Sequence, residues 1–128
     1  MKFEIPQDKW AEFFNDLSKR RFGWATKVEV LNGNTGNQTL SEGMSLNGIT
    51  FEEKSGHHEI EISVVENAAR HQTHNLARPL KVSYLSESET YRGVVEIEDK
   101  TGTVTRVSLL NPLPLYVTYE TYQLVAVA

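Results

Sequence analysis

The spacing of apolar residues changes once along the chain, from a helical period to a strand period. Over residues 6–21, apolar side chains recur three and four positions apart, which predicts an amphipathic helix. Pro6 suits the first turn of this helix, and Gly23 follows it as a stop signal. Three large aromatic rings on one short helix need a broad apolar surface to cover, and a sheet face is the natural candidate. The stripe consists of Trp10, Phe13, Phe14 and Leu17.

After Gly23 the apolar residues alternate with polar ones, as they do in half-buried strands of an antiparallel sheet. Asn47-Gly48 favours a tight hairpin turn, and Asp99–Gly102 favours a hairpin loop. Residues 66–78 are ambiguous, although Leu76–Pro79 favours extended chain because a residue before proline avoids the helical region. The predicted strands cover residues 24–31, 39–46, 49–52, 58–65, 80–84, 91–98 and 103–110, and residues 115–124 could add a last one.

One helix followed by six or seven short strands predicts an α+β fold. We expect the N-terminal helix to pack on a mainly antiparallel six- to seven-stranded sheet, arranged as a sandwich or a partly open barrel. A length of 128 residues is typical of one domain. We therefore expect a single domain over 1–128, with its core at about 3–112 and a tyrosine-rich C-terminal segment at 115–128.

The composition narrows the possible functions. The chain has no cysteine, which excludes disulfides and thiolate metal sites. The net charge is −4, whereas surfaces that bind nucleic acid or anionic lipid are basic. Neither is therefore an expected partner. The one basic run, Lys19–Arg21, lies at the negative end of the predicted helix, and the helix dipole accounts for it. Because phosphate-binding glycine motifs, a secretory signal and a long apolar span are all missing, we expect a cytoplasmic protein with no cofactor.

Histidines supply one candidate site. His71 and His74 lie three residues apart between Arg70 and Arg78. Two imidazoles at this spacing share a face only if the backbone is helical, whereas on a strand they point to opposite faces. A metal would need a third ligand, for which His58 and the carboxylates of the preceding strand are candidates. The alternatives are ordinary surface or structural histidines, or a pH-sensing or anionic-ligand site that includes the two arginines. The carboxylate candidates are Glu59 and Glu61, but these glutamates, like Glu96 and Glu98, also fit the solvated face of a sheet.

Tyrosines supply a second candidate. Tyrosine offers a large contact area with a polar tip, which suits protein interfaces. The segment after Pro114 is rich in tyrosine and could pack on a partner or on a second copy of the chain. The candidate interface residues are Tyr116, Tyr119 and Tyr122.

Several motifs follow one another along the chain. They are Ile5-Pro6-x-Asp8-x-Trp10-x-x-Phe13-Phe14, Gly23-Trp24, Val28-Glu29-Val30, Leu46-x-Gly48-Ile49, Ile60-Glu61-Ile62, His71-x-x-His74 and the hairpin over 94–110. Together they resemble a bacterial family, found in cyanobacteria among others, that is catalogued as domain of unknown function 5335. The resemblance covers residues 3–112, and the tyrosine-rich segment lies outside it. It implies a small, soluble, uncharacterised bacterial domain and assigns no catalytic residue.

The sequence favours a binding or accessory module over an enzyme. Such a module would act through a sheet edge and the C-terminal tyrosine segment, with an unknown protein partner or as a homodimer formed by strand addition. One alternative is a metal or anionic-ligand site at His71 and His74, in an enzyme or a sensor. Another is a small barrel that binds an apolar ligand in a void among Trp24, Phe51, Ile62 and Val82.

Overall fold

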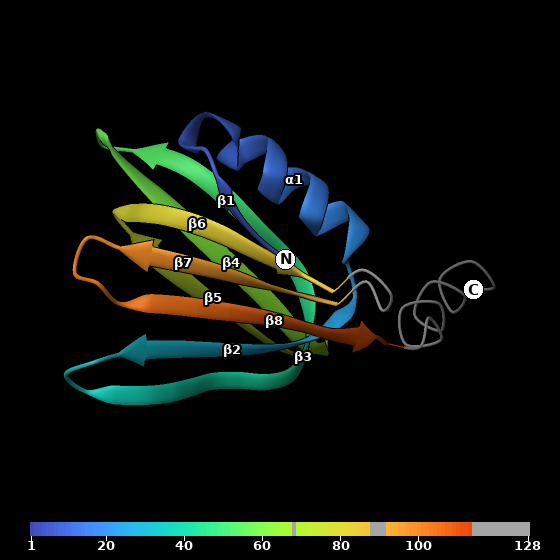
Figure 1. Cartoon of the computed structure of the whole chain (residues 1–128). Helices are drawn as coiled ribbons and strands as arrows, with labels where there is room; N and C mark the ends of the chain where they lie inside the picture. Colours follow the sequence, from blue (N-terminus) through green and yellow to red (C-terminus); the bar gives the residue numbers. More distant parts are fainter. Residues whose placement is uncertain (68, 88–91, 114–128) are drawn as a thin grey trace.

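A computed structural model describes residues 1–67, 69–87 and 92–113 of the chain. These residues form one antiparallel sheet of eight strands with one α-helix on its concave side (Figure 1). Across the sheet the strands follow the order β1-β6-β7-β8-β2-β3-β4-β5. The elements are β1 (Lys2–Ile5), a 3-10 turn (Gln7–Lys9), α1 (Trp10–Arg20), β2 (Trp24–Asn32), β3 (Gly36–Lys54), β4 (His57–Asn67), β5 (Arg70–Ala77), β6 (Pro79–Ser86), β7 (Gly93–Asp99) and β8 (Val104–Pro112).

The predicted helix is confirmed as the 3-10 turn followed by α1. Its apolar stripe is buried at Trp10, Phe14 and Leu17, and the indole Nε1 of Trp10 donates a hydrogen bond to the carbonyl oxygen of Ile5 at 2.8 Å. Gly23 has a φ of +83°, the left-handed conformation that a chain reversal after a helix commonly uses. The chain thus turns directly from α1 into β2, and the helix lies against β3.

The predicted hairpin turn at Asn47-Gly48 is wrong. The two predicted strands on either side of it are one 19-residue strand, β3, which pairs with β2 over its first half and with β4 over its second. Gly48 has no positive φ, which a type I′ turn would require. Instead, the register with β4 shifts between Leu46 and Gly48, so this dipeptide marks a bulge where β3 changes partner.

The sheet has eight strands rather than six or seven, and it is a single sheet that does not close, so the predicted sandwich is wrong. The sequence assigned no strand to residues 2–5 and left residues 66–78 ambiguous, but β1 and β5 occupy them as the two outer strands. The chain passes from β5 to β6 through a single residue, Arg78. The backbone N–H of Arg78 continues the pairing with β4 at His58, and its carbonyl oxygen accepts from the N–H of Lys100 after β7, so the two ends of the curved sheet approach each other there.

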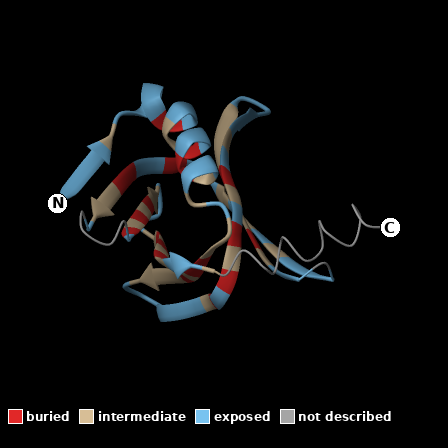
Figure 2. Ribbon diagram, turned by 90° about the vertical axis from the view of Figure 1, so that its right-hand side faces the viewer, coloured by how far each residue is buried: buried red, intermediate tan, exposed pale blue. Residues whose placement is uncertain are grey.

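The core lies between α1 and the concave side of the sheet. Figure 2 shows buried residues in red on α1 and along the strands of the sheet. Ile62 and Val82, two of the residues proposed to line a ligand void, are fully buried members of this core, and Trp24 and Phe51 pack against it. The described residues therefore favour a filled core over a ligand-binding barrel. No helix in the described part of the chain is long and apolar enough to cross a membrane.

Candidate functional site

β5 carries the predicted histidine pair, and strand geometry separates its two members. His74 is paired with Ile62, a core residue, so its side chain lies on the concave face. His71 is paired with Val65 and is exposed on the opposite face. Their positions three apart on a strand do not bring the two imidazoles together. Among the residues that the structure describes, no group of three histidine, aspartate or glutamate side chains is arranged to hold a metal ion.

The two predicted arginines also lie apart, at opposite ends of β5. Arg70 forms an ion pair with Glu66 at 3.0 Å. Arg78 follows the strand and lines a cleft beside His58 on the neighbouring strand β4. Arg78 therefore lies beside His57 and His58 rather than beside the predicted His71 and His74. Tyr116, Tyr119 and Tyr122 lie outside the described residues.

His74 is the histidine with an unusual environment. Its Nε2 atom is buried, and no described residue gives it a hydrogen bond. Burial disfavours the charged imidazolium and lowers the pKa of His74 below its ordinary value. A neutral ring with an unpartnered nitrogen therefore lies on the concave face of an outer strand.

The edges of the sheet differ in how they are protected from pairing with another strand. β1 is four residues long and carries Lys2 and Glu4, and short charged edges resist strand addition. The first half of β3 pairs only with β2, and two register shifts interrupt that pairing. Gly43, at one of these shifts, has a φ of +89°, which marks a bulge that twists the edge.

The second half of β3 is covered by the helix. The hydroxyl of Ser18 on α1 donates to the carbonyl oxygen of Ile49 at 3.1 Å and accepts from the backbone N–H of Ile49 at 2.9 Å. One serine thus satisfies both backbone groups of a residue that a further strand would otherwise use. The helix therefore hinders a further strand from pairing with this edge, as elements that cover strand edges commonly do.

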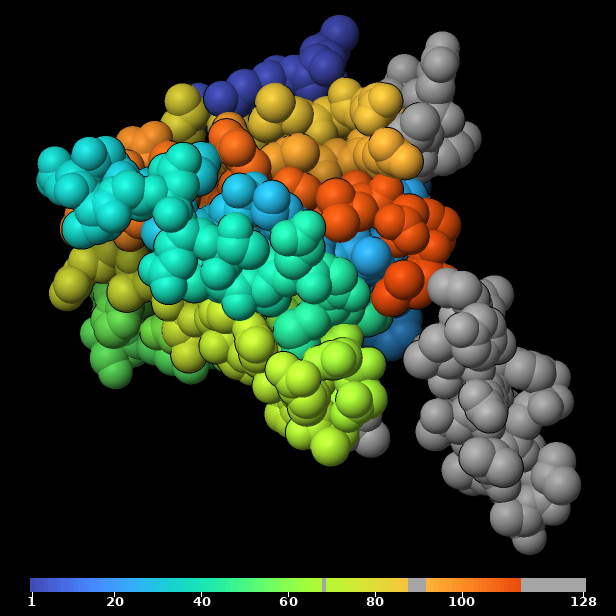
Figure 3. Space-filling model, turned by 90° about the horizontal axis from the view of Figure 1, so that it is seen from below, coloured from blue at the N-terminus to red at the C-terminus, as the bar shows by residue number. Residues whose placement is uncertain are grey.

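β5 has none of these protections. It is eight residues long, and no proline interrupts it. Arg70 is the one residue in it with a permanent charge. Its register with β4 runs without a shift from Ala77 to His71. Within the described part of the chain, β4 is the one strand that pairs with it. Figure 3 shows the β4–β5 corner, in yellow-green, exposed at the surface. The sequence predicted a sheet edge as the binding surface but did not identify the strand.

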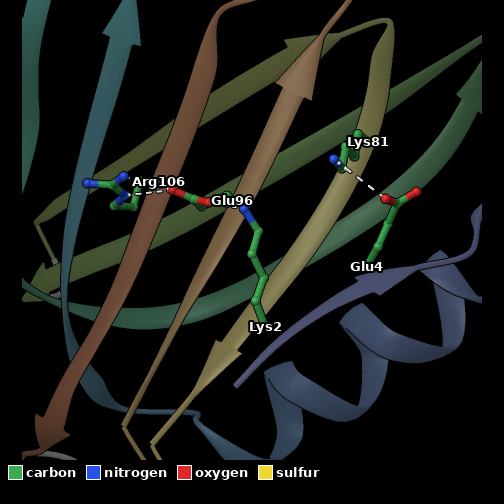
Figure 4. A network of polar contacts seen from close by, with 5 residues as sticks. All are labelled: Lys2, Glu4, Lys81, Glu96 and Arg106. Carbon is green, nitrogen blue, oxygen red and sulfur yellow. Dashed lines mark hydrogen bonds and ion pairs between the residues drawn. The ribbon is translucent and has the colours of Figure 1, made fainter.

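The convex face of the sheet carries ion pairs rather than a second site. Glu96 on β7 accepts two hydrogen bonds from Arg106 on β8, at 3.0 and 2.8 Å, and lies 3.5 Å from the Nζ of Lys2 (Figure 4). Burial alone would raise the pKa of Glu96, but the hydrogen bonds and charges of Arg106 and Lys2 outweigh it and lower that pKa. The side chain is therefore held as a carboxylate. Lys81 and Glu4 form a further pair at 3.5 Å, between β6 and β1.

Comparison with known proteins agrees with the predicted family. A protein from Aquifex aeolicus (strain VF5), described as uncharacterized, is 27% identical over 112 residues, which cover 86% of this chain and 95% of that protein. No solved structure matches the chain. The model of a family of unknown function, DUF5335, matches residues 1–117, which extends the predicted range of 3–112 at both ends. The chain therefore belongs to the DUF5335 family.

Proposed function

We propose that the protein is a small non-enzymatic binding module that acts by strand addition at the open edge of β5. The observation that carries this proposal is the contrast between the edges. β1 is short and charged, one half of β3 is bulged and the other is covered by α1, whereas β5 is long, regular and nearly uncharged.

The occupant that best fits this edge is a second copy of the same strand. In an antiparallel pair centred on Thr73, Thr73 would face its own copy, and threonine pairs across strands are favourable. The same register places Gln72 of the partner opposite His74. Side chains that oppose each other in a sheet lie about 5 Å apart, so Gln72 of the partner would lie beside His74 on the concave face.

The test is the molecular mass of the full chain over a range of concentrations, measured by light scattering after size-exclusion chromatography. We expect a dimer that dissociates on dilution. Thr73→Lys places two like charges opposite each other in the proposed pair and should give a monomer at all concentrations. Thr35→Lys makes the same substitution in the exposed β2–β3 turn and should leave the dimer intact.

A wild-type chain that stays monomeric would overturn the second copy as the occupant, and a dimer that survives Thr73→Lys would overturn the β5 edge as the interface. Truncation after Leu113 tests the proposed contribution of the tyrosine segment. If that segment takes part, the truncated chain should dimerise more weakly. An unchanged dimer would exclude a role for Tyr116, Tyr119 and Tyr122 in self-association.

A further inference from the structure

A polar cleft of about 540 Å³ lies where four distant segments of the chain meet. The segments are the 3-10 turn, the β3–β4 turn, the passage from β5 to β6, and the β7–β8 loop. Figure 1 shows the last three at the same end of the sheet, on the left. A concave site of this volume, formed at the junction of several elements, is typical of small-molecule sites. Its main polar lining residues are Gln7, Ser55, His57, His58, Arg78 and Lys100.

The side chains that line this cleft are basic or neutral. Arg78 and Lys100 supply two permanent positive charges, and no carboxylate is among the described residues that line the cleft. Neither cation forms an ion pair with a described acidic side chain, although most other lysines and arginines of the described chain do. Two unpaired cations in one concavity favour an anionic ligand.

The backbone at the cleft is unusual. Ser55, with a φ of 50°, and Arg78, with a φ of 52°, are the two non-glycine residues in the described part of the chain that have left-handed conformations. Five glycines also adopt such conformations, and one of them, Gly56, lines the same cleft. The sequence also predicted extended chain at Arg78, because proline follows it, and this expectation is wrong. Ser55 and Gly56 form the two-residue loop of the β3–β4 hairpin, in which a type I′ turn uses a positive φ at both positions. Arg78 is therefore the strained residue of the cleft, and strained conformations of this kind concentrate at functional sites.

Hydrogen bonds hold the strained arginine in place. The backbone N–H of Arg78 donates to the carbonyl oxygen of His58 at 3.1 Å, and its carbonyl oxygen accepts from the N–H of Lys100 at 3.2 Å. The two cationic residues are thereby connected through their backbones, across segments more than twenty positions apart in the sequence. The cleft is therefore partly preorganised, which lowers the entropic cost of binding.

The histidines of the cleft are also positioned. His58 Nδ1 lies 2.9 Å from the Nε2 of Gln7, and its ring packs edge-on against Phe51 at 5.1 Å. The nearest carboxylates approach from outside the lining: Glu53 lies 3.6 Å from His58, and Glu59 lies 3.8 Å from His57. Both ring nitrogens of His58 therefore already face protein groups, and this ring helps to fix the wall of the cleft beside the two cations.

We propose that this cleft binds a small organic phosphate through Arg78 and Lys100. A guanidinium presents a planar pair of donors that matches two phosphate oxygens, and an ammonium adds a second charge for a dianion. Pro79 and Leu80 form an apolar wall beside these groups, against which the organic part of the ligand would lie. This proposal does not depend on strand addition at β5.

The test is a titration of the full, isotope-labelled chain, followed by the backbone amide resonances at constant ionic strength. The probes are glycerol 3-phosphate, inorganic phosphate and unphosphorylated glycerol. We expect saturable shifts at Gly56, His57, Arg78 and Lys100 with glycerol 3-phosphate, and none with glycerol. Binding of inorganic phosphate at the same amides would show that the phosphate group alone suffices.

Arg78→Asn is the decisive variant because asparagine tolerates the left-handed conformation, so the chain should stay folded. We expect it to weaken glycerol 3-phosphate binding at least about tenfold. Arg70→Asn removes the same charge at the far end of β5, roughly 25 Å away along the strand, and should leave binding unchanged. Lys100→Gln provides a second weakened variant in case Arg78→Asn fails to fold.

If Arg78→Asn and Arg70→Asn weakened the binding of glycerol 3-phosphate equally, only the overall charge of the protein would matter, and the proposed site would be overturned. The absence of saturable binding of any phosphate probe to the wild-type chain would also overturn it. Saturation by inorganic phosphate but not by glycerol 3-phosphate would overturn the organic ligand and leave an inorganic anion site.

Discussion

Gly93 is a residue whose missing side chain leaves room for the ring of Tyr84 on the neighbouring strand β6. A Cβ atom at this position would lie 2.6 Å from the ring Cζ of Tyr84 on β6, far inside contact distance. Gly93→Ala should therefore lower the free energy of unfolding by about 1–3 kcal/mol, as overpacking does. Urea denaturation of the variant measures this loss.

A second substitution separates the steric cause from a general preference for glycine. Tyr84→Leu removes the ring, so Gly93→Ala should cost much less in that background, and the two changes should not be additive. Additive losses would contradict the proposed contact.

Gly102 and Gly93 differ in whether their role can be predicted from the sequence. The role of Gly102, with a φ of +86°, follows from its hairpin loop, whereas the role of Gly93 depends on a neighbouring strand that the sequence does not reveal.

At the scale of elements, Ser18 connects α1 to the edge of β3. Ser18→Ala removes the hydroxyl that bonds both backbone groups of Ile49 and leaves a part-buried N–H and C=O without that partner. We expect a loss of about 1–3 kcal/mol in the free energy of unfolding. Ser108→Ala, on the convex face of β8, is the matched control and should cost less than about 0.5 kcal/mol. Equal losses in urea denaturation would contradict the edge-covering role.

The elements that sequence reasoning found are those with strong local periodicity. The apolar stripe of α1 and the loop at Asp99–Gly102 are local features, and both predictions are confirmed. Asn47-Gly48 misled the prediction because its turn preference is local, whereas tertiary pairing with β2 and β4 keeps β3 continuous. The same limit applies to the candidate site. Strand alternation placed His71 and His74 on opposite faces once β5 was known, but which edge stays open depends on the order of all eight strands.

At the scale of the whole molecule, His74 and Glu96 both make stability depend on pH in the same direction. The folded state lowers the pKa of each, so it binds fewer protons than the unfolded state, and stability falls as the pH falls through each window. The pH range over which His74 lowers stability begins below about pH 6.5, and that of Glu96 begins below about pH 4.3. These are the ordinary pKa values of the two groups, and each range is called its window. Urea denaturation from about pH 8 to about pH 3, at one fixed protein concentration, should therefore show two successive losses.

Two substitutions assign these losses to their residues. His74→Gln should flatten the first window and leave the stability at pH 7 nearly unchanged, because the folded ring is already neutral there. Glu96→Gln should flatten the second window and cost about 1 kcal/mol at pH 7, because it breaks the charged contact with Arg106. His71→Gln and Glu61→Gln make the same chemical changes at the exposed face of β5 and on β4. If either control flattened its window as much as the matching variant, the loss would belong to the titration of the whole surface rather than to His74 and Glu96.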